Sequence, residues 1–102
     1  MKIGKYEFAG PFSNAGSLLP QSGVYVILGR SGDTNTSGAW SVIDIGESHD
    51  IQFRVNNHDR RNCWLRTGYQ ELAVAALYES EQVRGVIELE LRRIYNPPCG
   101  NR

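Results

Sequence analysis

One segment, residues 40–64, constrains the fold more than any other part of the sequence. Within it, residues 41–45 alternate short polar and branched apolar side chains, which is typical of a strand with one face on a core. We expect Gly46 to end this strand, because glycine allows a sharp turn and the close approach of a ligand. Ser48 or Asp50 can then cap a helix. The segment therefore predicts a strand, a turn and a helix in close succession.

The predicted helix brings an arginine and a histidine to one face. Ile51, Arg54, Val55 and His58 follow the spacing of three and four residues that aligns side chains on a helix. Arginine matches the geometry of phosphate oxygens, and histidine changes charge near neutral pH, so the pair suits a phosphodiester site. The same pair is also common on a solvated helix face, and the spacing alone leaves both interpretations open.

The remaining pattern predicts an α+β fold. Residues 23–29 and 71–78 are expected strands, and residues 31–39 form a long polar loop between the first two strands. Residues 1–22 are expected to be an N-terminal arm with one possible edge strand, and residues 23–102 the domain. Ser80 can cap a last helix that Asn96 and Pro97 end. Its apolar stripe is predicted at Val83, Val86, Ile87, Leu91 and Ile94.

Length and charge exclude several classes of protein. The chain has 102 residues and a formal net charge of zero, so it holds one domain and does not attract polyanions as a whole. A local basic patch, residues 51–66, suits transient contact with a polyanion. Because the N-terminus lacks the apolar core of a signal peptide and no stretch could span a membrane, we expect a cytoplasmic protein with reduced cysteines. The patch contains Arg54, Arg60, Arg61 and Arg66 against Asp59.

A zinc protein is an alternative with poor support. The candidate ligands are His49, His58, Cys63 and Cys99. Two cysteines at this separation do not follow the paired spacing of structural zinc sites. Zinc in the purified protein would be the observation in its favour.

Four separated features together resemble the GIY-YIG nuclease domain. They are Gly23-Val24-Tyr25, Asp44-Ile45-Gly46 followed by Glu47-Ser48, Arg54 with His58, and Glu88 with Leu91 and Pro97. The resemblance covers roughly residues 23–101. It implies a small three-stranded, mainly antiparallel sheet flanked by helices, and an enzyme that cuts DNA or RNA phosphodiester bonds with a divalent metal ion.

The resemblance also implies a role for each matching residue. Tyr25 would help to activate the attacking water, Arg54 would bind the scissile phosphate, and His58 would be a general acid or base. Glu88 would hold the metal ion, Mg²⁺ or Mn²⁺. Asn101 would match the asparagine that often ends the motif.

The assignment of Glu88 has two rivals. Arg84, Glu88 and Arg92 are four residues apart and could form exposed ion pairs on a helix. By helical phase, Glu90 falls among the predicted apolar positions, where a carboxylate is costly unless it binds a cation. The spacing of Glu88 to Leu91 and Pro97 favours Glu88.

The chain departs from the family at Asp44, where the second signature normally contributes a tyrosine. Asp44 can be a second acid near the metal or a partner of an arginine, or it can mark the loss of activity. Arg60, Arg61 and Trp64 could form a substrate surface in which Trp64 stacks on a base, although Trp64 could equally plug the core. The expected substrate-binding residues are Asp44, Ser48, Arg60, Arg61 and Trp64.

The function that these observations predict is a stand-alone, metal-dependent endonuclease. Its expected partner is nucleic acid, with DNA preferred to RNA, and it is expected to be a monomer or weak dimer away from membranes. The alternative is a catalytically inactive nucleic-acid-binding or protein-interaction module with the same fold.

Overall fold

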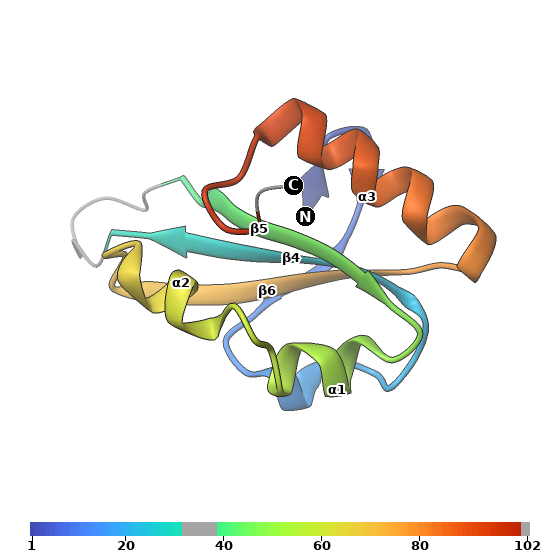
Figure 1. Ribbon diagram of the computed structural model, residues 1–102, viewed down its shortest axis with the longest axis horizontal. Helices are drawn as coiled ribbons and strands as arrows, with labels where there is room; N and C mark the ends of the chain where they lie inside the picture. Colours follow the sequence, from blue (N-terminus) through green and yellow to red (C-terminus); the bar gives the residue numbers. More distant parts are fainter. Residues whose placement is uncertain (32–38, 101–102) are drawn as a thin grey trace.

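The computed structural model describes residues 1–31 and 39–100, and in them a four-stranded antiparallel sheet lies between two layers of helices (Figure 1). The strand order is β3-β6-β4-β5, which makes β5 an edge strand. A separate two-stranded sheet, β1-β2, lies near the N-terminus. The elements are β1 (Lys2–Ile3), β2 (Tyr6–Glu7), β3 (Ala9–Phe12), the 3₁₀ helix η1 (Ala15–Ser17), β4 (Gly23–Arg30), β5 (Ser41–Ser48), α1 (Ile51–Asn56), α2 (Arg61–Arg66), β6 (Glu71–Tyr78) and α3 (Glu81–Tyr95).

The three long strands lie where the sequence predicts them, and β6 has the predicted bounds. The short strand β3 pairs with β6, so the N-terminal arm supplies the expected edge strand. One prediction was wrong: β5 does not end at Gly46 but continues to Ser48. Gly46 pairs with Tyr25, and a Cβ atom at Gly46 would collide with the Tyr25 ring and hydroxyl. The glycine serves close approach within the sheet, not a turn.

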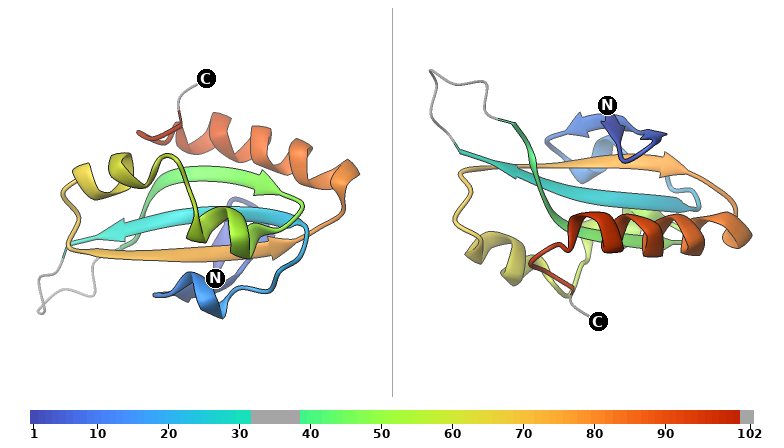
Figure 2. Two further views of the ribbon diagram at one scale, coloured as in Figure 1. Left: turned by 60° about the horizontal axis from the view of Figure 1, so that its bottom comes forward. Right: turned by 90° about the horizontal axis from the view of Figure 1, so that it is seen from above.

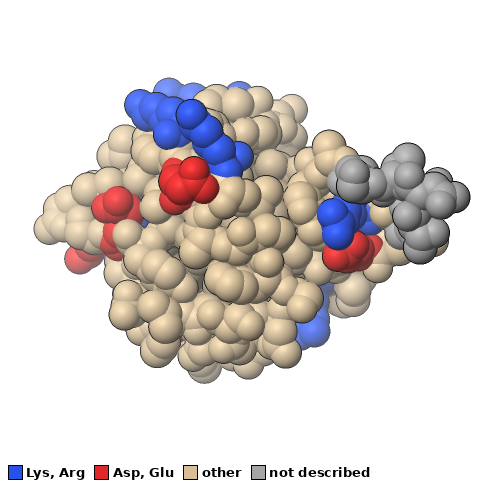
Figure 3. Space-filling view, turned by 180° about the vertical axis from the view of Figure 1, so that it is seen from behind, with Lys and Arg blue, Asp and Glu red and all other residues tan. Residues whose placement is uncertain are grey.

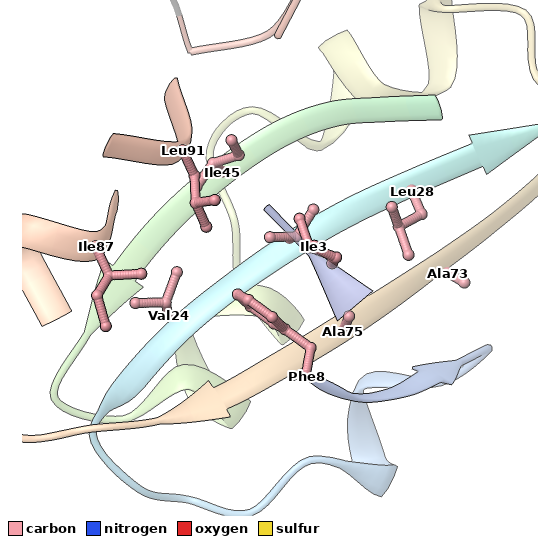
Figure 4. Packing of buried hydrophobic residues seen from close by; sticks show 10 residues of the cluster. Ile3, Phe8, Val24, Leu28, Ile45, Ala73, Ala75, Ile87 and Leu91 are labelled. Carbon is pink, nitrogen blue, oxygen red and sulfur yellow. The ribbon is translucent and has the colours of Figure 1, made fainter. Parts of the chain in front are cut away.

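The two faces of the sheet carry different cores. On one face, α3 and the β1-β2 hairpin cover Val24, Leu28 and Ile45 (Figure 4). On the other face, α1, α2 and η1 cover Tyr25, Ile27 and Ile43. Figure 2 shows the two helical layers on opposite sides of the strands. The first 22 residues take part in both cores, because Ile3, Phe8 and Leu18 are buried.

The segment between β5 and β6 differs from the prediction. Asp50 caps α1, since its side chain accepts a hydrogen bond from the Phe53 N–H at 3.0 Å. The helix ends at Asn56, so His58 lies in the connection that follows and not on the same helix as Arg54. Residues 61–66 form a second short helix, α2, which the sequence pattern did not predict.

The buried face of α3 is only partly the predicted one. Val86 and Ile94 are exposed by 65% and 57%, whereas Ile87, Glu88 and Leu91 are buried. The helix is rotated so that a row of charged residues meets the sheet. Burial of such charges is tolerated where each has an ionic partner.

The C-terminal tail is fastened to α2. Cys63 and Cys99 form a disulfide, and the Cys99 N–H donates to the Ile43 carbonyl oxygen at 3.0 Å. The prediction of two reduced cysteines was therefore wrong, because the fold brings together two residues that are 36 positions apart. None of the described helices is long and apolar enough to cross a membrane. Most of the loop predicted at residues 31–39, and Asn101, lie outside the described residues.

Candidate active site

A polar cavity of about 250 Å³ opens at the β5 edge of the sheet, between the two helical layers. Side chains from α1 and from the connection after it approach from one face, and side chains from α3 approach from the other. Because Gly46 has no side chain, the two groups of side chains can approach the same part of β5. The lining residues are Tyr25, Gly46, Glu47, Arg54, Arg60, Glu88, Arg92 and Gly100.

Tyr25 and His58 form a hydrogen-bonded pair at the floor of the cavity. The Tyr25 Oη atom lies 2.5 Å from His58 Nε2. The other ring nitrogen, Nδ1, accepts the backbone N–H of Arg60 at 3.0 Å. Because Nδ1 is an acceptor, neutral His58 carries its proton on Nε2 and donates it to the Tyr25 oxygen. The Tyr25 hydroxyl hydrogen is then directed elsewhere, and Tyr25 is the member of the pair that lines the cavity.

Burial and charge set the protonation of this pair. Burial, together with the charges of Arg54 and Arg60, lowers the pKa of His58 from 6.5 to about 4. Burial raises the pKa of Tyr25 to about 12, although Arg54 and Arg60 oppose this rise. At neutral pH the free protein therefore holds a neutral imidazole against a neutral phenol.

Arg54 is one of the residues that line the cavity. Its Nη2 atom donates to Asp59 Oδ1 at 2.9 Å, and its side chain is 36% exposed. The side chain of Asp59 is largely exposed, so this ion pair lies at the surface. An incoming phosphate can take its place, because exposed ion pairs contribute little free energy.

The structure places Glu88, and not Glu90, at the cavity. Glu88 is buried, lines the cavity and accepts a hydrogen bond from Arg92 Nε at 2.8 Å. Glu90 accepts a hydrogen bond from the Tyr6 hydroxyl at 2.9 Å and lies 3.8 Å from Lys5 Nζ, so it faces the N-terminal β1-β2 hairpin. Of the two rival carboxylates, only Glu88 can meet a ligand in this cavity.

Asp44 does not line the cavity but lies behind it, fully buried. Its carboxylate accepts hydrogen bonds from Arg60 Nε at 2.8 Å, Trp64 Nε1 at 2.7 Å and Arg92 Nη2 at 3.2 Å. Of the alternatives for this position, the pairing with arginine is therefore the observed one. Direct contact of Asp44 with substrate was a wrong expectation, because no part of the side chain is accessible.

The other expected substrate-binding residues divide between the cavity and elsewhere. Arg60 lines the cavity, whereas Arg61 lines a second cavity of about 320 Å³ beside α1 and α2. Trp64 is 6% exposed and packs on His58, so it plugs the core and cannot stack on a base. Ser48 is half-buried and exchanges hydrogen bonds with the backbone of Asp50, away from the cavity lining.

The sequence reasoning missed Arg92 and Gly100 as parts of the site. Arg92 joins Asp44 to Glu88 and also donates to the Gly100 carbonyl oxygen at 2.6 Å. The spacing of Arg84, Glu88 and Arg92 was the available signal. It suggested exposed ion pairs, but Arg92 is only 11% exposed.

A zinc site built from the expected residues is incompatible with the fold, because Cys63 and Cys99 are joined to each other. Across residues 1–31 and 39–100, no group of three or more His, Cys, Asp or Glu residues could hold a metal ion. The carboxylate chemistry of Glu88 still fits a cation that keeps water ligands. Mg²⁺ typically binds through one or two carboxylates, several waters and phosphate oxygens of the substrate.

No protein-family model and no curated protein matches the sequence. The fold is similar to three solved structures of the GIY-YIG N-terminal endonuclease domain of UvrC from Thermotoga maritima, all point mutants bound to the catalytic divalent cation. Each has a TM-score of 0.55, and the match covers 84% of this chain and 89% of that domain, at 17% or 18% identity. The chain has a GIY-YIG nuclease-like fold.

Proposed function

We propose that this protein is a metal-dependent endonuclease that hydrolyses phosphodiester bonds in nucleic acid. The observation that supports this most is the convergence of Tyr25, Arg54 and Glu88 on one cavity from three different elements. A proton-handling group, a phosphate-binding cation and a metal-binding carboxylate are the parts that metal-assisted hydrolysis of a phosphodiester requires. The UvrC domains that share the fold are described as endonucleases with a catalytic divalent cation.

Arg54 would bind the scissile phosphate. Its guanidinium lines the cavity, and Asp59, the acid to which it donates a hydrogen bond, is exposed. A planar guanidinium can donate two parallel hydrogen bonds to phosphate oxygens. It would also stabilise the charge that builds up on those oxygens as water attacks.

Tyr25 would handle the proton of the attacking water, and His58 would act through it. His58 Nε2–H fixes the position of the Tyr25 oxygen. The charges of Arg54 and Arg60 oppose the rise that burial causes in the pKa of Tyr25. Since the side chain of His58 is buried behind Tyr25, it does not reach the substrate. His58 is therefore a positioning residue and Tyr25 the catalytic one.

Glu88 would hold the divalent cation, with Mg²⁺ and Mn²⁺ both suited to an oxygen ligand. When bound, such a cation neutralises charge on the phosphate and lowers the pKa of a water ligand. The carboxylate is oriented by its hydrogen bond from Arg92. A carboxylate held in this way needs no reorientation when the substrate arrives.

Nucleic acid is the proposed substrate class, and DNA is the first form to test. Arg54 and Arg60 both line the cavity. On the opposite side of the molecule, the Lys and Arg side chains that can be seen lie toward the margins and the centre of the surface is uncharged (Figure 3). The side with the cavity is thus the better place for a phosphate backbone.

A binding module without catalysis is the second candidate. The pairing of Asp44 with arginines, in place of the tyrosine of the resembling family, is the observation that favours it. The protein would then hold a phosphate at Arg54 and Arg60 without cutting the chain.

A cleavage assay on single-stranded, duplex and branched DNA and on RNA separates the two candidates. We expect cleavage with Mg²⁺ or Mn²⁺ that EDTA stops and that Glu88→Gln abolishes. Glu90→Gln is the matched control, because it makes the same change on the same helix at a carboxylate that contacts Tyr6. Cleavage by Glu88→Gln at the parent rate would contradict the metal role, and binding without cleavage of any substrate would support the module.

A further inference from the structure

The buried carboxylate of Asp44 connects the two halves of the cavity. It accepts two hydrogen bonds from Arg60, from Nε to Oδ2 at 2.8 Å and from Nη2 to Oδ1 at 3.2 Å. Arg92 Nη2 donates to the same Oδ1 atom at 3.2 Å, while Arg92 Nε donates to Glu88. One acid therefore links the arginine side of the cavity to the carboxylate side.

The environment of Asp44 holds the carboxylate in one orientation. The Trp64 indole N–H donates at 2.7 Å, and the Ile45 backbone N–H donates at 2.8 Å. Gly100 packs directly against these hydrogen-bonded groups: a Cβ atom at Gly100 would lie 2.7 Å from Asp44 Oδ1 and 2.8 Å from Arg60 Nε. A side chain fixed on all sides can in turn fix its partners.

The hydrogen bonds with Asp44 position Arg60 at the cavity. Its side chain is 28% exposed, so the guanidinium reaches the cavity while one edge of it is held by Asp44. A free arginine side chain samples many rotamers and loses that freedom when it binds phosphate. An arginine that is already held in place binds without this loss.

We propose that Asp44 is a positioning residue that fixes Arg60 as a second phosphate-binding arginine beside Arg54, and that orients Glu88 through Arg92. This inference rests on the proposed function, since it assigns a phosphate to the same cavity. It explains why an acid occupies the signature position: the acid supplies no ligand to the substrate and instead presents an arginine to it.

The test is the binding of a fluorescently labelled DNA oligonucleotide, single-stranded and duplex, in EDTA. Arg60→Ala should weaken binding about tenfold, the loss expected for charge-assisted hydrogen bonds to phosphate. It should also lower the salt dependence by about one phosphate contact. Arg93→Ala is the matched control, because it removes the same charge from an exposed position on α3. Equal effects of the two substitutions would overturn the proposal.

A double-mutant cycle tests the link to Asp44. Asp44→Asn should weaken binding in the parent protein but not in Arg60→Ala, because the acid acts through that arginine. Independent, additive losses would overturn the proposal. If Asp44→Asn does not fold, Arg60→Lys decides: lysine keeps the charge but cannot form the two-bond contact, so binding should still weaken. Parent-like binding by Arg60→Lys would refute the positioning role.

These outcomes are separable from the proposed function. A parent protein that binds the oligonucleotide in an Arg60-dependent way but never cleaves it would keep this inference and defeat the endonuclease. An Arg60→Ala protein that cleaves at the parent rate would support the endonuclease function and contradict this inference. Absence of binding by the parent protein would defeat the inference directly.

Discussion

Acidification should destabilise this protein through one buried histidine. His58 is 6% exposed, and burial lowers its pKa in the folded state from 6.5 to about 4. Between these two values the unfolded chain binds a proton that the folded chain does not. The stability that depends on a neutral His58 is therefore fully present above pH 6.5. The free energy of unfolding falls as the pH drops from 6.5 toward 4. From pH 7 to pH 5 the expected loss is about 2 kcal/mol.

Urea unfolding at pH 7 and pH 5 measures this loss. The sequence offers a good control, because its other histidine, His49, is exposed. The His49→Gln protein should lose about the same free energy as the parent, whereas His58→Gln should lose much less between the two pH values. The reasoning is refuted if the stability of the parent does not change, or if His58→Gln retains the full pH dependence.

Three further predictions concern the site and the tail that closes it. Arg54→Ala should slow cleavage on the order of a hundredfold while the thermal unfolding temperature barely changes, because its ion pair is exposed; parent-like cleavage would make Arg54 a surface residue. Gly46→Ala should lower both the unfolding temperature and the cleavage rate, since the added methyl collides with Tyr25; a stable, active variant would contradict the packing. Replacing Cys63 and Cys99 by serine opens a 36-residue loop and should cost about 4 kcal/mol in urea unfolding, and an unchanged midpoint would argue against the disulfide.

Local patterns predicted the sheet well. The alternation in β5 and the branched and aromatic run in β4 reflect residues whose neighbours in sequence are also their neighbours in the fold. The error at Gly46 arose because glycine both ends strands and allows close approach within them. Only the position of the Tyr25 ring, on the neighbouring strand, distinguishes these two uses.

The resemblance named three residues that line one cavity, but it did not predict how the surrounding side chains are connected. The motif positions Tyr25, Arg54 and Glu88 do reach one cavity. His58 was expected on the helix of Arg54, yet it reaches Tyr25 from beyond the helix end. Helical spacing therefore singled out His58 for a geometry that the structure does not have. Its actual partner is 33 residues away, where periodicity carries no information.

The misassigned face of α3 and the acid at position 44 have one common cause. Counting apolar residues predicts that α3 turns Val86 and Ile94 inward, but the helix instead buries Glu88 and half-buries Arg92. That rotation is costly unless acid and base balance each other, and Asp44 provides the balancing charge from β5. A tyrosine at position 44 could not offset the charge of Arg92. The acid on the edge strand and the charged face of the helix are therefore one feature, and the pattern of either segment alone is misleading.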